Sequence, residues 1–247
     1  MIDMVEIQTP DGVMPTRVAR PETGRSRANI LIYMDAMGIR DELIVKFAQR
    51  YAQAGYTAVL PDLYYRFGKD VTFDATKSYK EMPAEQQPFF FSLVEKMRED
   101  GPVTRDTGLL LDAIPTQEGG ATAWGAIGYC MGGRFVVRAM AAYPDRIKAG
   151  ASVYGTALVT DQPGSPHRDV PRIRGEVYLA FGANDDLTPP PVIDTLREQF
   201  DQSGIKHETQ VFDGCGHAFM MPGKTSTYRH EAAEAVWAKS LALFSRL

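Results

Sequence analysis

Short apolar runs alternate with helical segments along most of the chain, and this alternation limits the folds open to it. The runs at 28–34, 57–60 and 122–128 are bounded by turn residues and are apolar on both faces, as buried parallel strands are. The segments 43–52 and 133–142 place apolar residues at helical spacing. Parallel strands need crossover connections, which helices provide. The pattern therefore predicts an α/β fold with a mostly parallel, doubly wound sheet.

The N-terminal residues add a hairpin to this sheet. Residues 5–8 and 13–18 flank Thr9–Gly12, whose Asp-Gly pair is a strong hairpin signal. The remaining strands are predicted at 148–154, 177–181 and 207–212. The remaining helices are predicted at 104–114, 192–200 and 228–246.

Two helices have apolar stripes that predict which residues they bury. The stripe of the last helix consists of Ala232, Ala235, Val236, Ala242 and Leu243. Residues 62–101 are less regular and contain a helix with the stripe Phe90, Leu93, Val94 and Met97. We expect this region to form an excursion over the active site.

Length, charge and cysteine content restrict the class of protein. The chain has 247 residues without a repeat or a dividing linker, so residues 1–247 are predicted to form a single domain. The net charge of −4, without a long basic cluster, argues against nucleic acid or an anionic membrane as the partner. Two cysteines, no leader pattern and no apolar run of about 20 residues predict a cytoplasmic protein.

The segment around Cys130 predicts a nucleophile on a tight turn. An apolar strand precedes the cysteine, a helical segment follows it, and glycines stand at 128, 132 and 133. This is the pattern of the strand–turn–helix elbow of hydrolases, with sulfur in place of oxygen. The turn sets the thiol at a helix N-terminus, where the helix dipole favours the thiolate. A buried structural cysteine is the alternative, and this segment alone does not exclude it.

A carboxylate and a histidine follow later strands in the order that such hydrolases use. Asp185 comes after the strand at 177–181 and four residues before Pro189, and His217 lies in a glycine-rich loop after the strand at 207–212. Asp186 competes with Asp185 for the role of the acid; the spacing to Pro189 favours Asp185. The three residues are therefore predicted to form a Cys130–His217–Asp185 catalytic triad.

The other histidines and the second cysteine do not add a metal site. His167, His207 and His230 are expected to be solvated surface residues. Cys215 stands two residues before His217, but zinc needs three or four ligands and no third is evident, so Cys215 is predicted to be a packing residue.

These motifs resemble those of dienelactone hydrolases. The resemblance rests on the G-Y-C-M-G-G block, the G-x-x-D-x-x-x-P block at 182–189 and the G-H-A-F block at 216–219. It extends to Pro61-Asp62-Leu63-Tyr64 and to the N-terminal hairpin, and so covers nearly the whole chain. It implies an α/β-hydrolase that opens an enol-lactone with this triad and without a metal or organic cofactor.

The resemblance also implies roles for residues around the triad. The backbone N–H groups of Ala36 and Met131 would form the oxyanion hole, and Asp35 stands where the family has an acid that hydrogen-bonds the resting nucleophile. Tyr64 is a candidate substrate-binding residue. Met221 occupies a position where well-known members have an arginine for the substrate carboxylate.

The apolar Met221 predicts that a carboxylate on the substrate is optional. Cations elsewhere would restore the charge if they reached the pocket. The candidates are Arg66, Arg105, Lys224 and Arg229.

The predicted function is hydrolysis of a small ester or lactone through a thioester intermediate, as in a carboxymethylenebutenolidase. A general carboxylesterase or thioesterase would share every catalytic residue and differ in its pocket. A catalytically inactive hydrolase fold and a redox-sensing thiol protein are the non-enzymatic alternatives. The inactive fold is disfavoured because no triad member is missing, and the redox sensor because the distant Cys215 is the only candidate resolving thiol. The sequence leaves the oligomeric state open.

Overall fold

Eight strands form one sheet in the spatial order β1-β2-β4-β3-β5-β6-β7-β8 in the computed structural model, which describes residues 2–40, 43–74, 76–77, 81–114, 123–224 and 226–247. The strands are Ile2–Thr9 (β1), Gly12–Ala19 (β2), Asn29–Tyr33 (β3), Thr57–Pro61 (β4), Trp124–Tyr129 (β5), Ile147–Val153 (β6), Glu176–Gly182 (β7) and His207–Phe212 (β8). Strands β3 to β8 pair in parallel with their neighbours, apart from the edge that β4 shares with β2. Strand β1 pairs antiparallel with β2, and β2 pairs antiparallel with β4. The predicted mostly parallel sheet with an N-terminal hairpin is confirmed.

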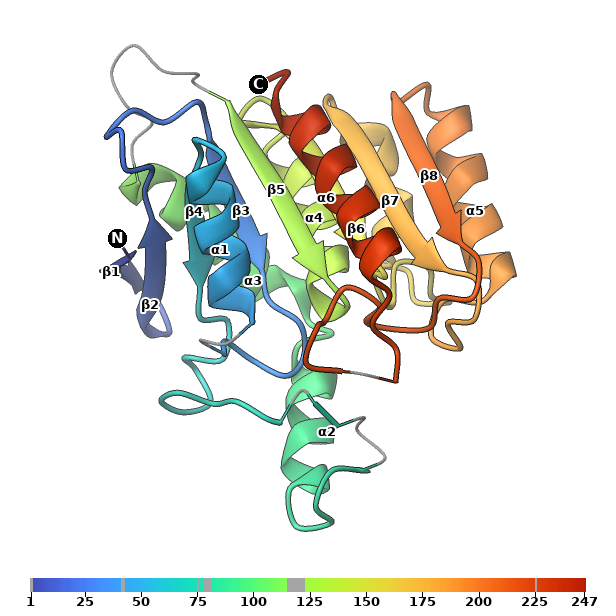
Figure 1. The fold of residues 1–247 in the computed structure, drawn as a ribbon, viewed down its shortest axis with the longest axis horizontal. Coiled ribbons are helices and arrows are strands. Elements are labelled where there is room, and N and C mark those ends of the chain that lie inside the picture. Colours follow the sequence, from blue (N-terminus) through green and yellow to red (C-terminus); the bar gives the residue numbers. More distant parts are fainter. Residues whose placement is uncertain (1, 41–42, 75, 78–80, 115–122, 225) are drawn as a thin grey trace.

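Helices cover both faces of this sheet, so the fold is doubly wound (Figure 1). The helices are Ile44–Gln53 (α1), Gln87–Lys96 (α2), Asp100–Ala113 (α3), Met131–Ala142 (α4), Pro190–Gln202 (α5) and His230–Phe244 (α6), with a 3₁₀ helix at Pro166–Arg172. On one face α1 and α6 pack together, with ring centroids of Phe47 and Trp237 5.2 Å apart. On the other face α4 contacts α3 and the 3₁₀ helix, which in turn contacts α5.

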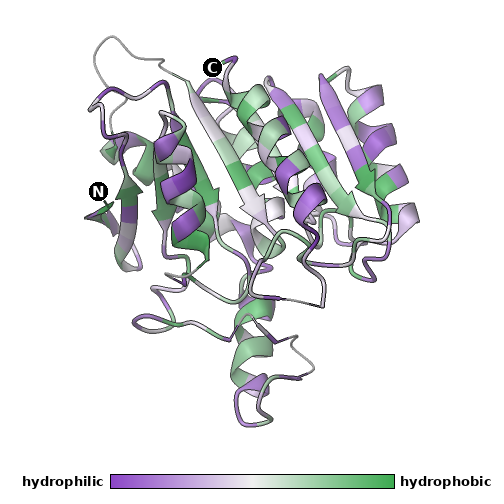
Figure 2. Ribbon diagram, viewed as in Figure 1, coloured by the Kyte–Doolittle hydropathy of each residue, from purple (hydrophilic) through white to green (hydrophobic). Residues whose placement is uncertain are grey.

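The hydrophobic core lies between the sheet and these two helix layers. All residues of β3, β4 and β5 are buried, which explains why their sequences are apolar without alternation. Figure 2 shows the hydrophobic central strands and the hydrophilic outer sides of the helices. Among the described helices none is both long and apolar enough to cross a membrane.

Three details of the predicted elements differ from the structure. Helix α6 buries Ala233 and Trp237 and exposes Ala242, so the predicted stripe is partly wrong, because the large ring of Trp237 fixes the buried side. Helix α3 begins at Asp100 instead of 104, since Pro102 falls in its first turn, where a proline N–H is not needed. The 3₁₀ helix at Pro166–Arg172 was missed. Residue 122, the predicted start of β5, lies outside the described residues.

Helix α2 stands apart from the two helix layers. Figure 1 shows it beyond the carboxyl ends of the parallel strands, where the loops after β3, β5, β7 and β8 also lie. Ligands of open α/β sheets bind at this edge. The placement agrees with the expectation that residues 62–101 form an excursion over the site.

Candidate active site

Cys130 occupies a strained turn between β5 and α4. Its backbone angles, φ 52° and ψ −119°, lie in a region that residues other than glycine rarely adopt. The turn is held from both sides, because the Cys130 N–H donates to the Val153 carbonyl (3.0 Å) and its own carbonyl accepts from Gly133 (3.0 Å). A Cβ at Gly132 would stand 2.6 Å from the Met34 carbonyl oxygen, so a side chain there would push α4 away from β3. The local geometry is that of the elbow predicted from the sequence.

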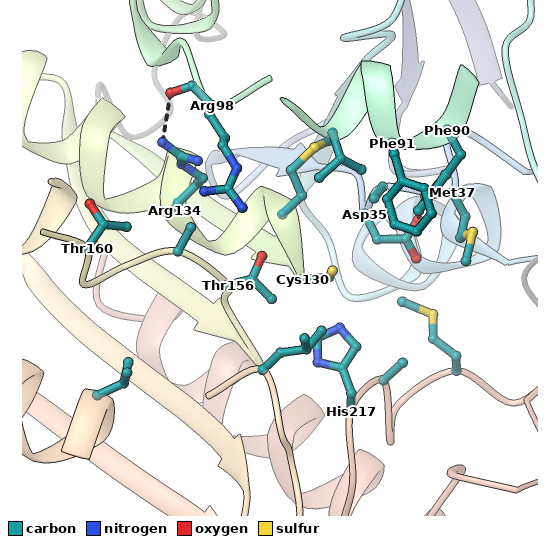
Figure 3. A pocket seen from close by; sticks show the side chains of 18 of the residues that line it. Asp35, Met37, Phe90, Phe91, Arg98, Cys130, Arg134, Thr156, Thr160 and His217 are labelled. Atoms are coloured by element: carbon teal, nitrogen blue, oxygen red, sulfur yellow. Dashed lines mark hydrogen bonds between the residues drawn. The ribbon is translucent and has the colours of Figure 1, made fainter. Parts of the chain in front are cut away.

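His217 and Asp185 meet beside this turn. The Nδ1 atom of His217 lies 2.8 Å from Oδ2 of Asp185, and the other oxygen of Asp185 accepts from the Leu187 N–H at 2.9 Å. Figure 3 shows the ring of His217 facing the sulfur of Cys130. Asp185 is buried and Asp186 is exposed, so the geometry agrees with the choice of Asp185.

For both His217 and Asp185, burial shifts the pKa in one direction and the neighbouring charges shift it in the other. Burial by itself lowers the pKa of His217, but the neighbouring Cys130 and Asp185 outweigh it and raise this pKa to about 10. Burial raises the pKa of Asp185, but the hydrogen bond and charge of His217 and the Leu187 N–H outweigh it, and the pKa is lowered. The environment thus favours the protonated, positively charged ring of His217.

The two residues predicted to form the oxyanion hole line the same cavity as Cys130. Met131 is the first residue of α4, and Ala36 follows β3. Within the described residues, neither N–H group donates to a carbonyl or a side chain. The hydroxyl of Tyr64 donates to the Ala36 carbonyl at 2.8 Å and is fully buried. Tyr64 therefore does not line the pocket; it holds the Ala36 peptide from behind.

Asp35 lines the pocket, but its carboxylate is hydrogen-bonded to Arg40 and to the backbone of Met37. Arg40 donates to both of its oxygens at 2.9 Å, and the Met37 N–H donates to Oδ1 at 2.9 Å. Both charged side chains are more than nine-tenths buried. Asp35 is thus engaged by Arg40, a partner that the sequence reasoning missed because nothing in the local pattern marks it.

The loops surround a cavity of about 510 Å³, a size suited to a small molecule. Its wall is largely apolar, with Met37, Phe90, Phe91, Val94, Leu187, Val192 and Met221 among the lining residues. Three cationic side chains also line it: Arg98, Arg134 and Lys224. Lys224 was one of the predicted compensating cations, whereas Arg98 and Arg134 were not considered. Met221 lines the cavity as expected.

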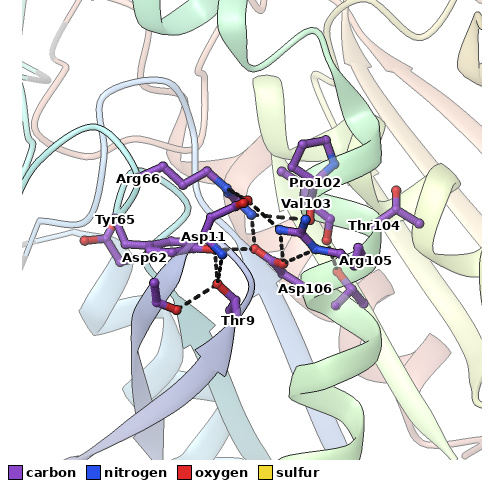
Figure 4. A network of polar contacts seen from close by, with 12 residues as sticks. Thr9, Asp11, Asp62, Tyr65, Arg66, Pro102, Val103, Thr104, Arg105 and Asp106 are labelled. Atoms are coloured by element: carbon purple, nitrogen blue, oxygen red, sulfur yellow. Dashed lines mark hydrogen bonds and ion pairs between the residues drawn. The ribbon is translucent and has the colours of Figure 1, made fainter.

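Arg66 and Arg105 lie outside the cavity, so the prediction that they bind the substrate is wrong. Figure 4 shows them in a polar cluster with Asp11 and Asp106, between the hairpin β1–β2 and α3. Both arginines pair with both aspartates. Neither is among the residues that line the cavity, and the same holds for Arg229. Their charges are neutralised where they are, so the cluster ties the hairpin to the domain.

The second cysteine and the other three histidines differ in how far they are buried. Cys215 is buried, and this burial raises the pKa of its thiol. His230 is exposed, as expected, whereas His167 and His207 are half-buried, with His167 beside the Ser165 hydroxyl at 2.8 Å. Within the described residues, no group of three His, Cys, Asp or Glu side chains is placed to hold a metal ion.

Comparison with known proteins places the chain in a family. The model of the dienelactone hydrolase family matches residues 14–247. The chain belongs to the dienelactone hydrolase family. It is therefore a hydrolase, and the enzyme class predicted from the sequence is confirmed at the level of the family.

Individual relatives are distant but match most of the chain. A provisionally named carboxymethylenebutenolidase of Methylorubrum extorquens is 28% identical over 237 residues, which is 94% of this chain and 77% of that protein. The mouse carboxymethylenebutenolidase homolog is 27% identical over 192 residues, 77% of this chain and 70% of that protein. A provisionally named dienelactone hydrolase structure from Klebsiella pneumoniae superposes with a TM-score of 0.84 at 23% identity, covering 100% of this chain and 99% of that one.

Proposed function

We propose that this dienelactone hydrolase family member opens small esters or lactones through a Cys130–His217–Asp185 triad with a thioester intermediate. The observation that carries the proposal is the Asp185–His217 contact of 2.8 Å beside a cysteine on a strained strand–helix turn. The names of the relatives, which include carboxymethylenebutenolidase, support the same substrate class.

Thioester formation is the first half of the reaction. The Cys130 thiolate attacks the carbonyl carbon, and the negative charge moves to the carbonyl oxygen, which the N–H groups of Met131 and Ala36 then stabilise. Such a donor typically contributes about 3–4 kcal/mol to the transition state. The carbon–oxygen bond breaks, and the alkoxide takes the proton from Nε2 of His217. Because the ionised Asp185 only accepts hydrogen bonds, Nδ1 of His217 keeps its own proton throughout.

Hydrolysis of the thioester is the second half. Nε2 of His217 removes a proton from a water molecule, and the resulting hydroxide attacks the thioester carbonyl. The same two N–H groups stabilise the second oxyanion. The carbon–sulfur bond breaks, the carboxylic acid product leaves, and Cys130 returns as thiolate beside the imidazolium. An ester or lactone suits this route better than an amide, because an alkoxide leaves more readily than an amide anion, and the nitrogen of an amide must be protonated before it can leave.

A redox-sensing thiol and an inactive fold have less support. Cys215 is the second cysteine of the chain, and its burial and raised thiol pKa make it a poor resolving thiol. Each group that the chemistry needs is present and oriented toward the others. A general carboxylesterase or thioesterase uses the same triad, so the pocket distinguishes it.

Selective alkylation tests the assignment of the nucleophile. Limited iodoacetamide treatment followed by peptide mapping is expected to label Cys130 first and to abolish hydrolysis of a phenyl ester in proportion to that label. Cys215→Ala serves as the matched control and is expected to lose activity at the same rate as the wild type. Equal labelling of the two cysteines, or inactivation that follows Cys215, would refute the proposal.

A further inference from the structure

Two apolar side chains of the cavity wall are also exposed to solvent. Phe91 on α2 is 47% exposed and Leu187, in the loop after β7, is 45% exposed, yet both line the cavity. A side chain that faces both a cavity and the solvent stands at the opening of that cavity. The opening is therefore flanked by large apolar side chains from two separate segments, and exposed apolar surface of this kind often marks a binding site.

Other aromatic rings hold Phe91 at this opening. Phe90 is buried, and its ring centroid lies 5.5 Å from that of Phe91 and 5.1 Å from that of Phe73. The N–H of Phe73 donates to the Met37 carbonyl at 2.9 Å, in the loop after β3. Figure 3 shows Met37, Phe90 and Phe91 on the same side of Cys130. The exposed ring of Phe91 therefore rests on residues that are fixed to the loop after β3.

The wall of the cavity continues the apolar character of the opening. Val94, Val159, Val192 and Met221 line the cavity from α2, the loop after β6, α5 and the loop after β8. Burial of apolar surface is not directional, so such a wall holds an alkyl group without a specific polar contact. The flexible side chain of Met221 can adapt to its shape.

The cations of the wall do not conflict with a neutral alkyl group. Among the described residues that line the cavity, the lysine and arginine side chains are Arg98, Arg134 and Lys224. Arg134 lies 2.7 Å from Asp100, and Arg98 lies 3.0 Å from Glu95. Long cationic side chains also cover apolar groups with their methylene segments while the charged end stays in water.

We propose that the substrate carries an unbranched apolar chain that extends from the reacting carbonyl at Cys130 to the opening and covers Phe91 and Leu187. The substrate class is then a neutral ester or lactone with an alkyl chain, because a compact polar lactone would leave both side chains in water. This proposal rests on the proposed hydrolase function. It extends the expectation, drawn from Met221, that a carboxylate on the substrate is optional.

Two series of esters test the chain. The p-nitrophenyl alkanoates from acetate to octanoate lengthen the acyl side, and the n-alkyl acetates from ethyl to octyl lengthen the alcohol side. Complete burial of one methylene group corresponds to about fourfold in kcat/KM. We therefore expect kcat/KM to rise by about two- to fourfold per methylene group in one of the two series, until the chain passes the opening.

Three variants locate the chain at the opening. Phe91→Ser and Leu187→Ser are each expected to lower the ratio of kcat/KM between the longest and the shortest ester by about threefold or more. This ratio does not depend on the amount of folded protein. Phe89→Ser is the matched control, because Phe89 lies on the same helix and is also 47% exposed but is not among the residues that line the cavity. It is expected to keep the wild-type ratio.

Several outcomes would overturn the proposal. Constant kcat/KM along both series would remove the chain and leave the hydrolase standing. A rise that neither Phe91→Ser nor Leu187→Ser reduces, or that Phe89→Ser reduces equally, would overturn the course through this opening.

Calorimetric binding of 2-butanone and 2-decanone to Cys130→Ala separates the chain site from the hydrolase function, because these neutral ketones are not hydrolysed. If no ester is hydrolysed, tighter binding of 2-decanone that is lost in Cys130→Ala/Phe91→Ser would support the chain site without the hydrolase. Equal binding of the two ketones would overturn the chain site as well.

Discussion

The loops after β3 and β7 hold a buried aspartate in nearly the same way but give it different partners. Asp35 accepts from the N–H of Met37 and Asp185 from the N–H of Leu187, each two residues further on and each at 2.9 Å. Asp185 then faces Nδ1 of His217, whereas Asp35 faces the guanidinium of Arg40. The two turns are alike; the partner differs.

The partner decides what each loop can do. An imidazole gains and loses a proton within the range that proteins use, whereas a guanidinium stays charged. The loop after β7 can therefore take part in proton transfer. The loop after β3 provides a fixed ion pair that holds the peptide carrying the Ala36 N–H. The Asp185–His217 pair is thus suited to catalysis, whereas the Asp35–Arg40 pair is suited to holding the loop in place.

Asp185→Asn should have the largest effect on turnover. The amide no longer favours the Nδ1–H tautomer of His217, and loss of this control costs about 10⁴-fold in kcat in comparable triads. The fold should remain intact, because the amide oxygen still accepts from the Leu187 N–H. Steady-state kinetics and thermal melting measure the two effects.

Asp186→Asn is the matched control, since Asp186 is exposed. It should retain turnover within about twofold, as surface substitutions do. A crippled Asp186→Asn beside an active Asp185→Asn would reverse the assignment of the acid.

Arg40→Met should lower the free energy of unfolding and should not act through proton transfer. It leaves the Asp35 carboxylate buried without its partner, which typically costs about 3–5 kcal/mol. Adding Asp35→Asn removes the stranded charge, so the double variant should recover much of the loss. Urea unfolding measures all three free energies. A single Arg40→Met variant as stable as the wild type would show that the pair does not hold this loop.

The elements that place the proposed triad could be predicted from the sequence because their signals are local. The buried strands are short apolar runs, and Gly132, directly after the turn at Cys130, is needed where α4 approaches the end of β3. Asp185 and His217 each follow a strand directly, so the parallel topology brings them to one edge. The buried side of α6 was predicted less well, because the packing of Trp237 against α1 is not visible in the spacing of small residues.

The pocket could not be predicted to the same degree, because its charges come from tertiary contacts. Arg66 and Arg98 look equally solvated in the sequence, yet one pairs with Asp106 and the other lines the cavity. Arg40 lies five residues after Asp35, a spacing at which side chains do not meet in a regular helix or strand. The turn at Gly38 brings the two side chains together. Such pairs depend on how loops fold back, which periodicity does not encode.

Tyr64→Phe should have a moderate effect that falls on kcat and not on KM. Loss of the hydroxyl leaves the buried Ala36 carbonyl without its donor and loosens the peptide that binds the oxyanion, which we expect to cost about tenfold in kcat, or about 1.4 kcal/mol. Tyr65→Phe is the matched control, because it removes a hydroxyl bound to Asp106, outside the cavity. Comparable losses of kcat in both variants would mean that the Tyr64 effect is general instability.

The smallest effect concerns how the two loops respond to pH. Burial lowers the pKa of His217, but Cys130 and Asp185 raise it from 6.5 to about 10, so the protonated ring stabilises the fold fully below about pH 6.5. This contribution is lost as the pH rises through about 10. In Cys130→Ala one source of the upward shift is gone, so the ring should titrate at a lower pH by ¹⁵N NMR. The stability difference from the wild type should shrink between pH 7 and pH 10, because the wild-type ring of His217 loses its proton over that range. An unchanged His217 titration in Cys130→Ala would mean that the thiol does not charge the ring, and the contrast between the two loops would then rest on Asp185 alone.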